Sequence, residues 1–177
     1  MEFIRIKTTR DTYWEQAWEI YEQSFPVFER RLFDNQVEAM KEESYNCVVV
    51  VKNDGVVGMI FYWEWEESIY IEHFAIHPDL RGQNYGSTIL KEFVESTSKV
   101  VILEIDPPID EISRRRRSFY KQLGFNMNDY DYTHPPYRKN IKPHALKILS
   151  YNQHLGEEMY QLFYDNVCNR AMKYIEK

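Results

Sequence analysis

The residues best suited to bind a ligand form a seven-residue loop, which consists of Arg81, Gly82, Gln83, Asn84, Tyr85, Gly86 and Ser87. An apolar strand that stops before Pro78 precedes this loop, and a helix with apolar residues on one face follows it. Free N–H groups at the start of a helix carry the positive end of its dipole and can bind a phosphate. The pattern therefore predicts a phosphate site, although an ordinary strand-loop-helix connection would look the same.

The strand before the loop carries the candidate base, Glu72. Simple alternation places Glu72 on one face with Tyr70 and Phe74, where partial loss of water would raise the pKa of its carboxyl toward neutrality. A structural glutamate that pairs with a cation is the alternative. In a regular strand, His73 and His77 point to the opposite face from Glu72. A bulge would change which side chains share a face, so His73 is a second candidate base.

Composition narrows the class of protein. With 177 residues, 44% of them hydrophobic, we expect residues 1–177 to form one domain, with residues 152–177 as a C-terminal helix. The net charge of −6 argues against nucleic acid or an anionic membrane as partner and favours cationic ones. Cys47 and Cys168 have neither metal-ligand nor disulfide spacing, so no metal is expected. The chain shows no signal peptide or membrane-spanning run, which predicts a cytoplasmic protein.

Hydrophobic periodicity predicts an α/β fold. Strands are expected at residues 3–6, 47–51, 56–63, 71–76, 100–105 and 145–151, with the second and third joined by a turn at Asp54 and Gly55. Helices are expected after a cap at Asp11 or Thr12, from about Phe28, from 88 to 94, from 110 to 122, and from about 155 onward. The last helix could pack against the domain or, in a homodimer, against a second subunit.

Two motifs in the right order point to one family. The loop resembles the Arg/Gln-x-x-Gly-x-Gly/Ala pyrophosphate loop of the GNAT superfamily of acyl-CoA-dependent N-acyltransferases, with Asn84 in place of the first glycine. Asparagine tolerates positive φ, so the turn can still form. Residues 119–125 match the Phe-Tyr-x-x-x-Gly-Phe signature that follows the fifth strand in many GNAT enzymes. The resemblance implies a mixed, twisted sheet of about seven strands with helices on both faces.

The resemblance also implies a reaction, the attack of a primary amine on the thioester of acetyl-CoA. An aliphatic amine with a pKa near ~10.4 needs a base, and the family often carries a glutamate at the place of Glu72. No Ser/His/Asp or Cys/His nucleophile arrangement is present, which favours direct transfer. In the family a tyrosine beside the cofactor sulfur protonates the departing thiolate. The resemblance implies this role for Tyr120, which is rotated about 100° from Phe119 and is expected to face the cleft. A packed tyrosine whose hydroxyl only binds water is the alternative.

The cofactor is expected to lie along the strand, the loop and the helix after the fifth strand. Strand N–H groups would stabilise the oxyanion and bind the pantetheine arm. Ser113 and Arg116 depart from the family pattern, so the contacts of their helix stay open. One arginine of the run 114–117 is expected to meet a CoA phosphate, with a solvated basic face as the alternative. The full set of expected contacts, beyond the seven loop residues, is Phe74, Ala75, Ile76, Ser113, Arg116 and Phe119.

The acceptor is expected to be a cationic small molecule such as a polyamine or an amino sugar. Acidic and aromatic side chains near the last hairpin and between the first two helices favour it: Asp129, Tyr130, Asp131, Tyr132, Phe25, Phe28 and Glu29. A protein or peptide amine is an alternative acceptor. A catalytically silent module that binds acyl-CoA as a sensor is the alternative from another class, and turnover would distinguish it from an enzyme.

Overall fold

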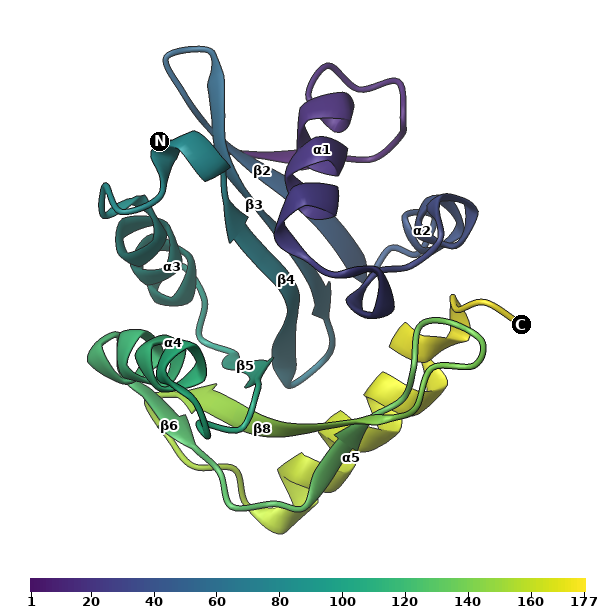
Figure 1. The fold of residues 1–177 in the computed structure, drawn as a ribbon, viewed down its shortest axis with the longest axis vertical. Coiled ribbons are helices and arrows are strands. Elements are labelled where there is room, and N and C mark those ends of the chain that lie inside the picture. Colours follow the sequence, from purple (N-terminus) through teal and green to yellow (C-terminus); the bar gives the residue numbers. More distant parts are fainter.

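The computed structural model describes all 177 residues as a mixed α/β fold built on one eight-stranded sheet (Figure 1). The strand order is β1-β2-β3-β4-β5-β8-β6, and β7 pairs with β8. The strands are β1 (Glu2–Ile6), β2 (Tyr45–Lys52), β3 (Gly55–Glu64), β4 (Ser68–Ile76), β5 (Val100–Ile105), β6 (Phe125–Met127), β7 (Tyr132–His134) and β8 (His144–Tyr151). This confirms the predicted fold class, with eight strands in place of about seven.

Five α-helices cover the two faces of the sheet (Figure 1). They are α1 (Trp14–Ser24), α2 (Phe33–Ala39), α3 (Tyr85–Glu95), α4 (Glu111–Gln122) and α5 (Glu157–Asn169), with short 3-10 turns η1 (Val27–Glu29), η2 (Pro78–Leu80) and η3 (Ala171–Lys173). The larger core lies between the sheet and α1, α2 and α5. A second core lies between the opposite face and α3 and α4. No helix is long and apolar enough to cross a membrane.

The first elements differ from the expected boundaries. α1 begins at Trp14, and the carboxylate of Asp11 accepts the N–H groups of Lys7 and Thr8, so Asp11 closes the preceding turn and does not cap the helix. The amphipathic stretch expected from Phe28 divides into η1 and α2. The hairpin between β2 and β3 is present, but Asn53 and Asp54, with φ of 50° and 62°, are its central residues.

The sheet opens at its centre, where β4 and β5 separate. These parallel neighbours pair only from Ser68 opposite Val100 to Ile71 opposite Leu103. Beyond that point β4 continues along β3, and β5 continues along β8. The two strand edges that face the opening therefore have N–H and C=O groups without a strand partner on that side. Figure 1 shows β4 at the centre of the molecule and β8 below it.

A bulge in β4 decides where its polar side chains lie. Phe61 of β3 is opposite His73 and the next residue, Tyr62, is opposite Ile71, so Glu72 is an extra residue in the ladder. Glu72 and His73 consequently both contact groups on the side of α1 and α5, whereas Phe74 packs into the core under α3 and α4. The expectation of a regular strand with Glu72 and Phe74 on one face is wrong.

Candidate active site

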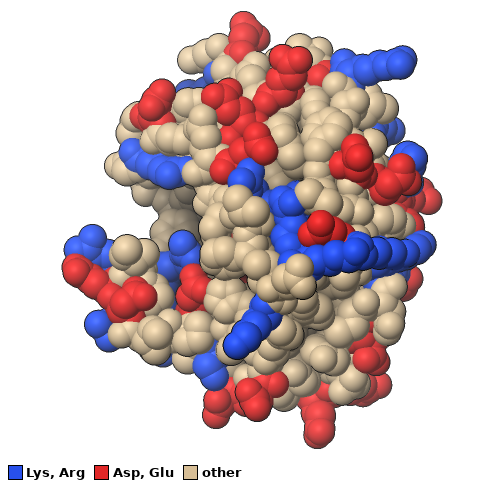
Figure 2. All heavy atoms as spheres, turned by 45° about the vertical axis from the view of Figure 1, so that its right-hand side comes forward, with Lys and Arg blue, Asp and Glu red and all other residues tan.

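A cleft of about 1310 Å³ occupies the opening between β4 and β5. The loop of residues 81–87 and α4 form one end, and η1, β7 and the start of β8 form the other. On the face drawn in Figure 2, a hollow separates an upper from a lower part of the molecule, and acidic and basic side chains are interspersed. Most of the predicted site residues line the cleft: Glu72, Phe74, Ala75, Ile76, Arg81, Gly82, Asn84, Tyr85, Gly86, Arg116, Phe119 and Tyr120.

The loop before α3 has the geometry of an anion site. Gly82 and Asn84 have positive φ, of 76° and 66°, so asparagine takes the left-handed conformation expected of it. None of the backbone N–H groups of residues 82–87 donates to another group of the protein. A Cβ atom at Gly86 would lie 3.5 Å from Ile76 and 3.6 Å from Phe119, so a larger side chain would reach into the cleft. These features suit backbone binding of a phosphate.

Three polar side chains of the loop hold its shape. Arg81 donates to the carbonyl of Ile76 at 3.1 Å and to the hydroxyl of Ser24 at 2.9 Å, which ties the loop to the ends of β4 and α1. Gln83 donates to the carbonyl of Asp79, and the Ser87 hydroxyl donates to Asn84. Gln83 and Ser87 are not among the residues that line the cleft.

The polar residues of α4 differ from the expectation. Ser113 is buried and completes the capping box of α4, since its N–H and its hydroxyl both donate to the carboxylate of the N-cap residue Asp110, and it does not line the cleft. A cofactor contact by Ser113 is therefore not supported. Arg116 lines the cleft, but its guanidinium bonds Asp106 at 3.0 Å. Arg115 also lines the cleft and pairs with Glu111 on the exposed side of the helix.

Phe119 and Tyr120 both line the cleft at the side of the loop. The ring of Tyr120 packs edge-on against Phe119 and Phe125, at centroid distances of 5.1 and 5.6 Å. Burial raises the pKa of the phenol of Tyr120 to about 12, and the hydroxyl makes no hydrogen bond within the protein. At neutral pH this hydroxyl is a proton donor that faces the cleft.

Glu72 lies in the cleft wall, but its carboxylate is fully engaged. Both oxygens accept from the guanidinium of Arg31 at 2.6 Å, and Trp63 and Tyr137 donate to them as well. Burial alone would raise the pKa of Glu72, but the charge and hydrogen bonds of Arg31 outweigh it and lower the pKa to about 2. The expected rise in this pKa is wrong. Glu72 is the cation-paired structural glutamate that the alternative interpretation described.

His73 has one buried ring nitrogen without a hydrogen-bond partner. Its Nε2 lies 2.9 Å from the carbonyl oxygen of Glu29, and because a carbonyl can only accept, Nε2 carries the hydrogen. Nδ1 has no hydrogen-bond partner and lies 3.8 Å from Glu72. Burial lowers the pKa of His73 to about 4, so the ring is neutral at pH 7.

A second buried glutamate, Glu104, lies at the end of β5 beside the opening. Tyr70 donates to its Oε2 at 3.0 Å and Tyr132 donates to its Oε1, but no arginine or lysine contacts it. Burial raises the pKa of Glu104, against the opposing effects of His134 and the two tyrosines. Glu104 has the properties that were expected of Glu72.

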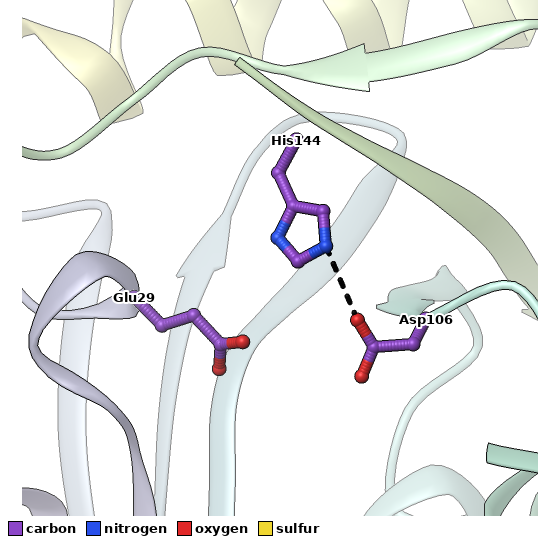
Figure 3. A group of neighbouring side chains, drawn as sticks. All are labelled: Glu29, Asp106 and His144. Atoms are coloured by element: carbon purple, nitrogen blue, oxygen red, sulfur yellow. Dashed lines mark ion pairs between the residues drawn. The ribbon is translucent and has the colours of Figure 1, made fainter. Parts of the chain in front are cut away.

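Three further side chains meet at the rim of the cleft, at the end formed by η1 and the start of β8. Figure 3 shows Glu29 from η1, Asp106 from the segment after β5 and His144 from the start of β8 pointing toward one another. Their ligand atoms lie within 4.8 Å of one another, and Nε2 of His144 is 3.3 Å from Asp106. Partial burial and the charge of Asp106 raise the pKa of Glu29. These atom types could hold a metal ion or another cation.

A sequence profile of the acetyltransferase (GNAT) family matches residues 12–125, which include both the phosphate loop and Tyr120. The chain belongs to the GNAT acetyltransferase family. It is an acetyltransferase that uses acetyl-CoA as co-substrate, as the two motifs predicted. A search of curated proteins finds no match.

Solved GNAT structures share this fold. A GNAT-family acetyltransferase from Bacteroides thetaiotaomicron is 27% identical, with a TM-score of 0.91 over 97% of this chain and 98% of its own. An acetyltransferase from Bacillus subtilis, solved in complex with CoA, is 14% identical, with a TM-score of 0.60 over 86% of this chain and 98% of its own. The second similarity concerns the fold alone.

The residues expected to bind the acceptor line this GNAT cleft only in part. Phe25, Phe28 and Glu29 line it as expected. The four residues near the hairpin do not, since Tyr132 is buried, Tyr130 stacks on Tyr160 at 3.8 Å and Asp129 and Asp131 point to solvent. Glu104 was missed, although it is the one charged residue in the apolar run of 100–105, and an isolated charge in a buried strand is a signal.

Proposed function

We propose that this enzyme acetylates a primary amine of a cationic small molecule by direct attack on acetyl-CoA. The carboxylate of Glu29 carries this proposal, because it lies at the acceptor end of the cleft without any ion-pair or hydrogen-bond partner in the protein. Glu104 lines the same end and also has no cationic partner. Asp106 adds a third carboxylate, and Arg116 offsets its charge. A cationic acceptor would find complementary charge there.

The cleft supports an assignment of roles along the reaction path. The phosphates of acetyl-CoA bind the loop of residues 81–87, and the thioester reaches the opening between β4 and β5. Unpaired strand N–H groups from residues 74–76 stabilise the oxyanion that forms when the amine nitrogen attacks the carbonyl carbon. Glu104 takes the proton that the ammonium must lose first, in place of Glu72. The C–S bond then breaks as the carbonyl re-forms, and Tyr120 donates its proton to the sulfur, giving free CoA. The second proton of the attacking nitrogen passes to the Tyr120 phenolate, which leaves the neutral amide, and Glu104 releases its proton to solvent.

Replacement of Tyr120 by phenylalanine keeps the ring and removes the proton donor. We expect the turnover number to fall by about 10²-fold, the lower end for a general acid, because a thiolate can leave unaided. Acetyl-CoA affinity, measured by calorimetry, should stay almost unchanged. Tyr62→Phe is the matched control, since Tyr62 makes no hydrogen bond in the protein and lies outside the cleft. Turnover of Tyr120→Phe within twofold of wild type at neutral and alkaline pH would show that the assigned role is wrong.

The acceptor class is tested by the release of CoA from acetyl-CoA across a panel of amines. The panel should hold monoamines, polyamines, amino sugars and short peptides with a free N-terminus, each at several concentrations. We expect kcat/KM to be highest for small amines that carry positive charge. A peptide as the best acceptor would contradict the cationic small molecule, and tight CoA binding without release for any amine would favour a sensor.

A further inference from the structure

Two polar atoms in the wall of the cleft, Nε2 of His134 and Oε2 of Glu104, make no hydrogen bond with each other. His134 is 5% exposed, and its Nδ1 lies 2.6 Å from the carbonyl oxygen of Pro135, so Nδ1 carries a hydrogen. In the neutral ring, Nε2 then presents a lone pair. Nε2 has no hydrogen-bond partner, and the nearest charged atom is Oε2 of Glu104 at 3.9 Å. A distance of 3.9 Å is too long for a hydrogen bond between them. One donor placed about 2.8 Å from each would satisfy both atoms.

A second gap of the same kind lies between Glu29 and Asp106. Their carboxylate oxygens lie within 4.8 Å of each other and of His144. An ammonium nitrogen that bonds two oxygens at about 2.8 Å, with tetrahedral geometry, holds them at a separation of this order. Arg116 offsets one of the two negative charges, which leaves a single charge for one more cation. The raised pKa of Glu29 agrees with a carboxylate that lacks a cationic partner.

The chain fixes the spacing of the two gaps. Glu104 belongs to β5, Asp106 is the first residue after it, and both side chains line the cleft. Two residues of extended chain would separate their Cα atoms by about 6.6 Å. A straight chain of three or four carbons spans a comparable distance between two terminal nitrogens. The aromatic rings of Phe28 and Tyr137 line the cleft beside these groups and can cover the apolar carbons of such a chain.

We propose that the acceptor is a short diamine, with one nitrogen held between Glu104 and His134 and the other between Glu29 and Asp106. This inference rests on the proposed function and adds the substrate class. The first nitrogen loses a proton to Glu104 and attacks the thioester carbonyl. The second stays protonated, does not react, and holds the molecule in register with the opening between β4 and β5.

Binding to the CoA complex tests the inference without any chemistry. Calorimetry should be run with straight-chain diamines of two to six carbons and with butylamine, which has one nitrogen. We expect the tightest binding at three or four carbons, and at least about tenfold weaker binding for butylamine. Equal affinities along the diamine series, or equal affinities for diamine and butylamine, would overturn the proposal.

Glu29→Gln locates the second nitrogen. It should weaken binding of the preferred diamine by about tenfold and leave butylamine unchanged, because only the diamine uses this carboxylate. Glu92→Gln, the same change on the exposed side of α3 outside the cleft, is the matched control and should change neither. An equal loss of affinity for the diamine and for butylamine would overturn the proposal. Tight binding of Mn²⁺ would also overturn it, if Mn²⁺ excludes the diamine and Glu29→Gln abolishes its binding. Failure of the proposed function would instead appear as absence of CoA release from wild type.

Discussion

Replacement of Glu72 by glutamine is expected to lower the free energy of unfolding by about 3–5 kcal/mol, because it leaves a buried charge without its partner. The Arg31 and Glu72 side chains are both 0% exposed. Glutamine keeps nearly the same shape and can accept one hydrogen bond, but it cannot balance the guanidinium. Urea unfolding at pH 7, followed by tryptophan fluorescence and by circular dichroism, measures the difference.

The guanidinium of Arg31 also holds the C-terminal segment in place, so the position of this side chain matters for the whole fold. Arg31 donates to the carbonyl oxygens of Ala171 and Tyr174 at 2.9 and 3.1 Å, besides its two bonds to Glu72. A displaced Arg31 would therefore loosen η3 as well as the wall of the cleft. We expect Glu72→Gln to increase hydrogen exchange at residues 170–177 before any other region changes.

The chain provides a matched control on α4. Arg115 and Glu111 form an ion pair of the same chemistry, but their side chains are 77% and 74% exposed. Glu111→Gln should cost less than about 1 kcal/mol, since water screens an exposed pair. Similar losses for Glu72→Gln and Glu111→Gln would mean that the buried pair contributes no more to stability than a surface pair.

The effect of Glu72 should depend on pH in a defined window. Its pKa is lowered from 4.5 to about 2 in the folded protein, so its contribution is fully present above pH 4.5 and is lost as pH falls toward 2. Below that pH the wild-type carboxyl is itself protonated, and the difference between wild type and Glu72→Gln should vanish. A difference that stays constant from pH 6 to pH 2 would contradict the ion pair.

The fold and the conformation of the loop before α3 could be predicted because their signals are local. The loop of residues 81–87 carries its own turn chemistry, and Asn84 adopts the left-handed conformation that its residue type allows. The stripe of apolar residues on α3 and the valine run of β2 likewise need no distant partner. In each case the residues that decide the structure are neighbours in the sequence.

The role of Glu72 could not be predicted, because two distant facts decide it. One is the bulge in β4, which depends on the register with β3. The other is Arg31, which lies 41 residues earlier in a segment without regular structure. Burial was expected correctly, but burial raises a carboxyl pKa only where no cation is near. Glu104 shows the opposite case, since its partners are the phenols of Tyr70 and Tyr132.

We therefore expect the two glutamates to have different roles: Glu72 stays ionised and stabilises the fold, and Glu104 exchanges a proton during the reaction. Four ionisable groups face Glu104 from the elements around it, namely Tyr70 and Glu72 of β4 and Tyr132 and His134 of β7. The tyrosines oppose the rise in the pKa of Glu104, as does the histidine when its ring is protonated, and the charge of Glu72 adds to the rise. Burial is the largest effect, so the carboxyl can take a proton from an ammonium more readily than an exposed glutamate can.

Glu104→Gln should lower the turnover number by about 10²- to 10⁴-fold at pH 7, the range for loss of a general base. Acetyl-CoA affinity should not change, since Glu104 lies at the acceptor side of the opening. Glu92→Gln on α3 is the matched control and should match wild type. If Glu104→Gln retains turnover within threefold of wild type, with its fold confirmed by circular dichroism, Glu104 is not the base.

The pH profile of this variant separates a missing base from a damaged site. In wild type, kcat/KM should fall on the acid side as Glu104 becomes protonated, at a pH above the usual range of a glutamate because burial raises its pKa. Without the carboxylate, only acceptor that is already neutral can react, so the rate should rise about tenfold per pH unit until it nears the amine pKa of ~10.4. The gap between variant and wild type should therefore close in alkali. A deficit that stays constant at every pH would indicate a distorted cleft and would remove Glu104 from the mechanism.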